Sequence, residues 1–398
     1  MNSITSVSRN LVSETEFLEI LTSYATANDF PFALWRLPES PTKYFLIANQ
    51  HRHLSSEDAI EELPTGFIFA PFDRARPSVF LPANFLFSFE DGKINVDETP
   101  LGARSLNWFE TEFQSLKKST GPKKYASSHC DTKKLCPDYL NLVNRCINEI
   151  EKGTLEKVVP SRQHVVDLPA GFDVIETFEK VCGRYSHALV SFVSIPGTGS
   201  WLTATPETLV TVEHGTIFKT VALAGTKAYT EGANLKSIAW TQKEIEEQAL
   251  VERYIISCFK KIRLREYDEQ GPKTVVAGNL MHLKTDFKVD MKAAGFPQLG
   301  SIMLQLLHPT SAVCGMPLEA ATEFLKQHEG YDRSFYAGYL GPVNVNNNIH
   351  LFVNLRCMQL LDTKGILYAG AGVTIDSVPE EEFEETEMKF NTLRNVIL

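Results

Sequence analysis

The last helix-forming segment, residues 379–396, carries ionisable side chains beside an apolar stripe. Glu382, Glu385 and Lys389 follow i, i+3 and i+7 spacing, so they share one helix face along the edge of that stripe. Such a face could be a surface salt-bridge ladder, in which Glu385 pairs with Lys389. It could equally present carboxylates to a site, and the helix alone does not decide between the two.

A second helix-forming segment, residues 243–262, offers a carboxylate that could complete such a site. Glu247 lies in a stripe with Val251, Tyr254 and Cys258, while Glu244 and Glu246 are rival carboxylates on the same helix. If Glu247 and Glu385 converge, two carboxylates completed by water and substrate oxygens would suit Mg²⁺. The sequence does not show whether they converge.

Two cationic side chains occupy strand-forming segments among apolar neighbours. In residues 349–361, one face of the expected strand holds Arg356 between large apolar side chains, where an unpaired charge is costly and an anionic partner is expected. That partner could be a ligand or a structural carboxylate. In residues 156–166, Lys157 points the same way as Leu155 and Val159. A desolvated lysine can serve as a base, whereas a lysine at a strand edge would only extend to solvent.

The elements that must position these residues indicate an α+β fold, one large domain with mostly antiparallel β-sheets flanked by helices. Strand-forming runs are joined by short turns such as 346–348, and the helices stand apart from them without a regular βαβ alternation. An irregular region around residues 309–317 precedes the last strands. A Lys- and Ser-rich stretch, 117–134, predicts an exposed loop. We therefore expect an N-terminal part, 1–136, and a catalytic region, 137–398, within the same domain.

Composition narrows the class of protein. A formal net charge of -10 disfavours nucleic acid as a partner, and an anionic substrate would need a local basic pocket. Seven scattered cysteines without a Cys-x-x-Cys pair indicate reduced thiols. There is no apolar run of signal-peptide or membrane-span length, which leads us to expect a cytoplasmic protein that acts without a membrane.

Several segments together resemble the chorismate-utilising enzymes, which include isochorismate, salicylate, anthranilate and aminodeoxychorismate synthases. These segments are residues 157–162, 205–208, 223–226, 307–317, 335–341, 355–357, 369–372 and 382–389. The resemblance covers roughly residues 137–398, and it implies the fold of anthranilate synthase component I. It also implies Mg²⁺ as cofactor and chorismate as the small-molecule substrate.

The resemblance assigns roles to individual positions. Glu247 and Glu385 match the magnesium-binding glutamates, with Glu382 as a further carboxylate nearby. Glu207 matches the general acid that protonates the departing ring hydroxyl. The remaining matches are to the substrate-binding positions, which are Gly225, Thr226, His282, Ala312, Val313, Arg356, Gly370 and Lys389.

Two positions select one member of the family, in which the reactions differ in nucleophile and in pyruvate elimination. Aminating members typically have a non-basic residue at the Lys157 position, so lysine there favours activation of water. Lyase members usually have Thr where this chain has Ala312. The combination is closest to isochorismate synthase, with Lys157 as the base. Val313 and Pro160 replace the more usual Leu, which puts the rate in doubt more than the type of reaction.

The expected reaction is the Mg²⁺-dependent interconversion of chorismate and isochorismate, with water added at C2 and the C4 hydroxyl lost. Salicylate synthase, an aminating enzyme of the anthranilate or aminodeoxychorismate synthase type, and an inactive chorismate-binding regulator are the alternatives. We expect a monomer without an amidotransferase subunit. The product could feed menaquinone or siderophore biosynthesis, and the sequence does not choose between them.

Overall fold

The computed structural model describes residues 13–98, 125, 138–229, 232, 234–277 and 280–397. The expected loop 117–134 lies, apart from Tyr125, outside the described residues, as do Cys130 and Cys136. The description of Thr226 is limited to its backbone. None of the described helices is both long and apolar enough to cross a membrane.

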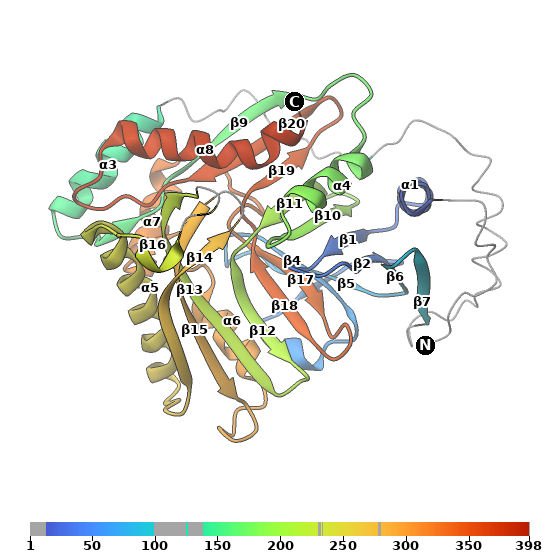
Figure 1. Ribbon diagram of the computed structural model, residues 1–398, viewed down its shortest axis with the longest axis horizontal. Helices are drawn as coiled ribbons and strands as arrows, with labels where there is room; N and C mark the ends of the chain where they lie inside the picture. Colours follow the sequence, from blue (N-terminus) through green and yellow to red (C-terminus); the bar gives the residue numbers. More distant parts are fainter. Residues whose placement is uncertain are drawn as a thin grey trace.

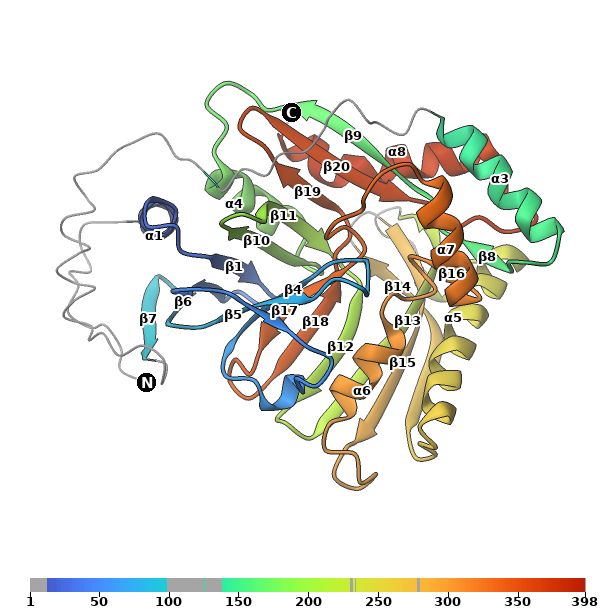
Figure 2. The ribbon, with the colours of Figure 1, turned by 180° about the vertical axis from the view of Figure 1, so that it is seen from behind.

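Two nine-stranded sheets face each other at the centre of the molecule (Figures 1 and 2). Sheet A runs in the order β7 (Lys93–Glu98), β6 (Phe85–Glu90), β2 (Lys43–Ile47), β1 (Phe32–Arg36), β10 (Leu189–Ile195), β11 (Gly199–Thr205), β19 (Cys357–Leu360), β20 (Lys364–Gly370), β9 (Ser161–Asp167). Sheet B runs in the order β14 (Asp268–Ala277), β15 (Leu280–Asp290), β13 (Ile217–Ala228), β12 (Thr208–Glu213), β18 (Ile349–Val353), β17 (Tyr339–Val343), β4 (Gly66–Ala70), β5 (Ser78–Pro82), β3 (Arg52–Leu54). Each sheet thus contains strands from both the early and the late parts of the chain.

A third, two-stranded sheet pairs β8 (Lys157–Val158) with β16 (Gly315–Met316). The pairings between the described strands are antiparallel, which confirms the expected α+β class. The described α-helices are α1 (Glu14–Ala27), α3 (Tyr139–Glu151), α4 (Val174–Arg184), α5 (Gln242–Lys261), α6 (Leu299–Leu307), α7 (Leu318–His328) and α8 (Pro379–Ile397).

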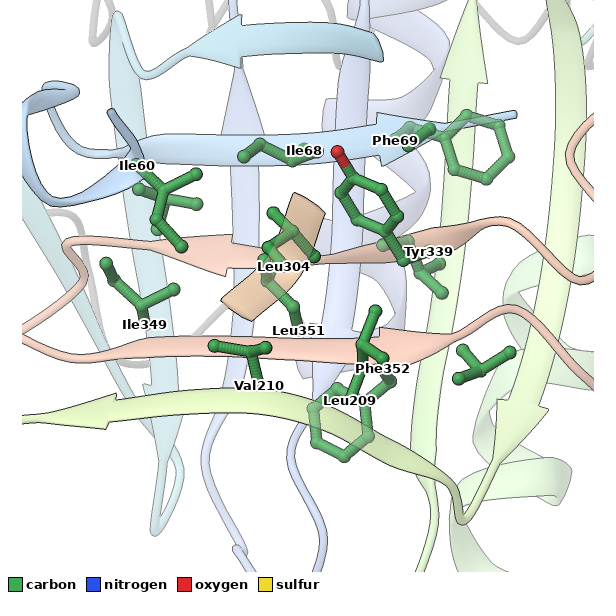
Figure 3. Close-up of a cluster of buried hydrophobic side chains, with 14 of the residues drawn as sticks. Ile60, Ile68, Phe69, Leu209, Val210, Leu304, Tyr339, Ile349, Leu351 and Phe352 are labelled. Carbon is green, nitrogen blue, oxygen red and sulfur yellow. The ribbon is translucent and has the colours of Figure 1, made fainter. Parts of the chain in front are cut away.

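Sheet A is buried on both faces, which explains why β10 and β11 are buried at every position. One face packs on sheet B in a core that also takes residues from α5 and α6. Figure 3 shows part of it, where Leu304 of α6 lies among side chains of β4, β12, β17 and β18. The other face is covered by α1, α4 and α8, with Phe390 and Leu393 of α8 in this second core.

The predicted strand 349–361 is wrong in one respect that matters for the site. The chain leaves sheet B at the end of β18 and enters sheet A at β19, and Arg356 lies in the crossing segment instead of mid-strand. Arg356 has a positive φ of 48°, which reverses the chain locally. Asn354 holds the crossing, since it accepts from the Thr203 hydroxyl (2.8 Å) and donates to the Phe335 carbonyl (2.8 Å). The alternation of apolar residues continues from β18 into β19, so it gave no sign that the chain changes sheets between them.

The predicted strand 156–166 is also interrupted, between β8 and β9, and β8 leaves Lys157 only 1% exposed. By contrast, the helices at 243–262 and 379–396 are confirmed within a residue or two by α5 and α8. Helix α6 ends and α7 begins on either side of the irregular region 309–317, which contains β16.

Candidate active site

A cavity of about 170 Å³ lies where α5 and α8 meet the ends of several strands. It is lined by residues from the turn before β12, from β13, β15 and β20, from the crossing before β19, and from the first turns of α5. Most of the site residues expected from the sequence meet here. These are Glu207, Gly225, Glu247, His282, Ala312, Val313, Arg356, Gly370, Glu385 and Lys389.

Lys157 reaches this cavity through Glu247. Its Nζ lies 2.6 Å from Glu247 Oε1, and the lysine side chain is 2% exposed against 27% for the glutamate. Burial disfavours the Glu247 carboxylate, but the charge and hydrogen bond of Lys157 outweigh it and lower the pKa of Glu247. Lys157 is therefore a buried side chain with a charged partner, and not a lysine extending to solvent from a strand edge.

Glu385 and Lys389 form the expected i, i+4 pair, with Lys389 Nζ 2.6 Å from Glu385 Oε1. The pair is not a surface ladder, because both residues line the cavity. Lys389 Nζ also donates to the Gly370 carbonyl at 2.7 Å, which ties α8 to the end of β20. This contact fixes the register of the helix face against the sheet.

Arg356 presents a buried guanidinium to the cavity. Burial lowers its pKa, although the carboxylates of Glu385 and Glu207 act in the opposite direction. Its Nη1 is buried and has no hydrogen-bond partner among the described residues. An unsatisfied buried donor of this kind is costly, and a carboxylate ligand would satisfy it with a charge-assisted hydrogen bond. Arg356 and Lys389 thus supply the local basic pocket that the net negative charge of the chain requires.

Glu207 follows β11 and lines the same cavity. Burial raises the pKa of its carboxyl to about 7, even though the cations Arg356, Lys389 and Lys157 act in the opposite direction. Its carbonyl accepts from the Val353 N–H at 2.9 Å, which fixes its backbone beside β18. A carboxyl with this pKa can both give and take a proton near neutral pH.

His282 is buried on β15 with its Nδ1–H 2.8 Å from the Gly225 carbonyl. Burial lowers its pKa to about 4, so the imidazole is neutral at pH 7. Gly225 itself has a φ of 65°, and a Cβ there would lie 3.1 Å from Glu244 Cβ. A Cβ on Gly370 would lie 2.8 Å from the Pro160 carbonyl. Both glycines are therefore required by close packing around the cavity.

Two further expected residues, Glu382 and Thr226, are not among the described residues that line the cavity. Glu382 is 1% exposed and lies behind the cavity wall, 3.2 Å from Lys243 Nζ. Burial raises its pKa, and the neighbouring Glu385 acts in the same direction. Thr226 lies on β13 next to Gly225, and its side chain is outside the described part of the chain.

Further residues line the cavity that the sequence interpretation did not assign to the site. They include Lys243, Tyr336, Leu355, Tyr368, Gly372 and Glu244, which it named only as a rival to Glu247. Helix periodicity could have identified Glu244, because it precedes Glu247 by three residues just as Glu382 precedes Glu385. Glu244 also caps α5, accepting from the Thr241 N–H at 2.7 Å. The tyrosines carry no such signal, since a buried tyrosine is usual in a core.

The residues present fit a magnesium ion. Glu247, Glu385 and Glu244 bring carboxylates to one cavity, and the ion pairs of these three glutamates with lysines involve their Oε1 atoms. No group of three or more His, Cys, Asp or Glu side chains converges on one point in the described ranges. Mg²⁺ does not require such a cage, since it usually takes one or two carboxylates and completes its shell with water and ligand oxygens.

Gly372 is a sensitive point, because a Cβ there would lie 3.0 Å from Lys157 Cε and 3.2 Å from Glu247 Oε1. We expect Gly372→Ala to displace the Lys157 amine by a fraction of an ångström and to lower turnover roughly tenfold. Steady-state kinetics would measure this. Gly183→Ala is the control, because nothing lies within 4 Å of a Cβ at that helical glycine. Equal activity of the two variants would contradict the expectation.

Comparisons with known proteins identify the family of this chain. The chain matches the family model described as chorismate binding enzyme over residues 73–398. It is 32% identical to the salicylate biosynthesis isochorismate synthase of Pseudomonas aeruginosa over 263 residues, 64% of this chain and 53% of that protein. It is 29% identical to an isochorismate synthase of Bacillus subtilis over 271 residues, 64% of this chain and 66% of that protein. The match thus spans about half to two thirds of the length of these curated relatives.

Among solved structures, the menaquinone-specific isochorismate synthase of Escherichia coli superimposes with a TM-score of 0.74 at 21% identity. That superposition covers 95% of this chain and 91% of the other. It supports the fold, and the family model covers most of the chain and all of the cavity-lining residues. The chain belongs to the family of chorismate binding enzymes.

Proposed function

We propose that the protein is an isochorismate synthase that interconverts chorismate and isochorismate with Mg²⁺ as cofactor. One observation carries the proposal. A buried lysine, Lys157, contacts Glu247 in the wall of a cavity that is also lined by Glu207, with its pKa of about 7, and by the cations Arg356 and Lys389. Such a set can add water to a dianionic substrate and remove a hydroxyl group from it.

In the proposed mechanism, Arg356 and Lys389 hold the carboxylates of chorismate through charge-assisted hydrogen bonds. Lys157 takes a proton from the water that attacks C2. Glu207 gives its proton to the C4 hydroxyl as that group leaves as water. Held by Glu247 and Glu385, Mg²⁺ would neutralise the ring carboxylate as charge shifts across the diene.

Ala312 and Val313 support a reaction that stops at isochorismate. Both line the cavity, and neither supplies a hydroxyl there. In the resembling lyases, a threonine usually occupies the position of Ala312. We also propose that the enzyme is cytoplasmic and that it acts as a monomer, without an amidotransferase subunit.

Product analysis tests the function. The protein is incubated with chorismate and Mg²⁺, with and without EDTA, and the products are separated by chromatography. We expect isochorismate without pyruvate, its loss with EDTA, and its return with excess Mg²⁺. Pyruvate with salicylate would indicate a salicylate synthase, and an aminated product that requires ammonium would indicate an aminating enzyme. Binding without turnover, unaffected by changing Glu207, would indicate an inactive regulator.

A further inference from the structure

We propose that Glu329 and Arg333 are positioning residues that hold the Lys157 segment against the Ala312–Val313 wall of the active site. The inference rests on the proposed function, in which Lys157 is the base. Both side chains are buried, each 3% exposed, and neither lines the active-site cavity. Any effect on the reaction must therefore pass through the residues that they contact.

The pair is bidentate, and its remaining polar atoms contact the backbone around the site. Arg333 Nε and Nη2 donate to the two oxygens of Glu329, each at 2.7 Å. Arg333 Nη2 also donates to the Val159 carbonyl at 2.7 Å, and Nη1 donates to the Val313 carbonyl at 2.8 Å. Val159 lies two residues after Lys157 and Val313 directly follows Ala312, so one guanidinium bridges the two segments.

The carboxylate holds a third segment. Glu329 Oε1 accepts from the Ser161 N–H at 2.7 Å and from the Ser161 hydroxyl at 2.6 Å. Ser161 is the first residue of β9, which pairs with β20 and places Gly370 opposite Ser161. The ion pair thus fixes both ends of the link from β8 to β9, residues 159–160, which directly follows Lys157 and Val158 of β8.

Besides a bridge between Val158 and Val373, β8 is held by a short ladder with β16. It contains two residue pairs, Val158 with Gly315 and Lys157 with Met316. The next contact along it is the Val159 N–H donating to the Cys314 carbonyl at 2.9 Å. Arg333 extends the ladder by one further rung, since it joins the carbonyls of Val159 and Val313. The bridge made by Arg333 therefore lies at the end of the ladder nearest to Ala312, which directly precedes Val313.

Stability alone does not account for such a pair. A buried ion pair loses much of its Coulombic gain to desolvation, and apolar residues of similar volume are often as stable. An arginine offers a planar fork that can bind a carboxylate with two donors and still reach two carbonyls. A lysine has one ammonium group and cannot make all these contacts. Positioning of two active-site segments is the property that requires arginine here.

The test compares Arg333→Lys with Arg36→Lys in the full chain. Arg36 is also buried and also bridges backbone carbonyls, including those of Tyr185, Ser186 and Ala188, but these three residues do not line the cavity, whereas Val159 and Val313 do. We expect both variants to lose similar thermal stability. In Arg333→Lys, kcat should fall about 10- to 100-fold while KM for chorismate changes less than about threefold, because Arg356 and Lys389 are untouched. In Arg36→Lys, kcat should stay within about twofold of the wild type, because no active-site segment moves.

Ser161→Ala is a milder second variant, which removes one hydroxyl contact to Glu329 and leaves the ion pair intact. We expect a fall in kcat of roughly three- to tenfold with little change in KM. Equal kcat in the two arginine variants at matched stability, a loss confined to KM, or unchanged kcat in Ser161→Ala would each overturn the inference. Failure of the wild type to form isochorismate would instead refute the proposed function, and it is seen before any variant is made.

Discussion

Lys157→Met is expected to lower isochorismate formation about 10²- to 10⁴-fold, the usual contribution of a positioned acid or base. Methionine keeps the length and apolar stem of the side chain but cannot accept a proton. The Lys157 side chain is 2% exposed and its Nζ lies 2.6 Å from Glu247, which lines the cavity. Turnover of chorismate by the variant, followed by chromatography, measures the effect.

Ammonia separates loss of the base from damage to the site, because ammonia attacks without prior deprotonation by the protein. At high pH with ammonium present, Lys157→Met should still form an aminated adduct of chorismate. Lys219→Met is the matched control, since that lysine pairs with Glu213 away from the cavity and should retain full activity. Full isochorismate formation by Lys157→Met, or equal loss with both nucleophiles, would remove Lys157 from the role of base.

Glu207→Gln is expected to lower kcat by a similar factor, about 10²- to 10⁴-fold, because an amide cannot donate the proton to the leaving hydroxyl. It should also change the pH dependence. The forward step needs neutral Lys157 and protonated Glu207, whereas the reverse step needs the ammonium and the carboxylate. Both states hold one proton between the two groups, so both directions must share one pH profile.

The direction of the pH dependence follows from how the proton is shared between Lys157 and Glu207. Lys157 Nζ donates to Glu247, and burial raises the pKa of Glu207 to about 7. Below this pH the pair holds two protons, and kcat/KM should fall as the pH falls in either direction. Profiles of kcat/KM around pH 7 measure this limb, which should vanish in Glu207→Gln and persist in the control Glu213→Gln, a half-buried glutamate away from the cavity. A wild-type limb far from 7, or one that survives in Glu207→Gln, would contradict the assignment.

Helix periodicity predicted α8 and the shared face of Glu382, Glu385 and Lys389. It could not decide between a surface ladder and a site, because that depends on what the face meets. The answer lies in the Lys389 contact to Gly370 of β20 and in the convergence of α5 on the same cavity. Such contacts join residues that are distant in sequence, so they cannot be predicted from the spacing of residues within one helix.

Strand alternation was less informative at Arg356 and Lys157. It predicted continuous strands, whereas the chain changes sheets at Arg356 and breaks after Val158. A single residue with positive φ redirects the backbone without disturbing the order of apolar residues. The partner of β8 is β16, more than 150 residues later in the chain, so the burial of Lys157 could not be derived from its own segment.

The Glu329–Arg333 pair gave no signal in the sequence. Its i, i+4 spacing is common on exposed helices, where such pairs contribute only a few tenths of a kcal/mol. Its burial arises because the pair lies just beyond α7, between the β8–β9 link and the Val313 segment. Only the assembled fold distinguishes it from a surface ion pair.

Turnover of chorismate with Mg²⁺ in ¹⁸O-labelled water tests most directly whether this cavity adds water at C2. The products are analysed by mass spectrometry coupled to chromatography. We expect isochorismate with one ¹⁸O in its C2 hydroxyl, no pyruvate, and chorismate recovered at equilibrium with label at C4, because the reaction is reversible. Unlabelled isochorismate, or pyruvate with salicylate as the main products, would contradict the account.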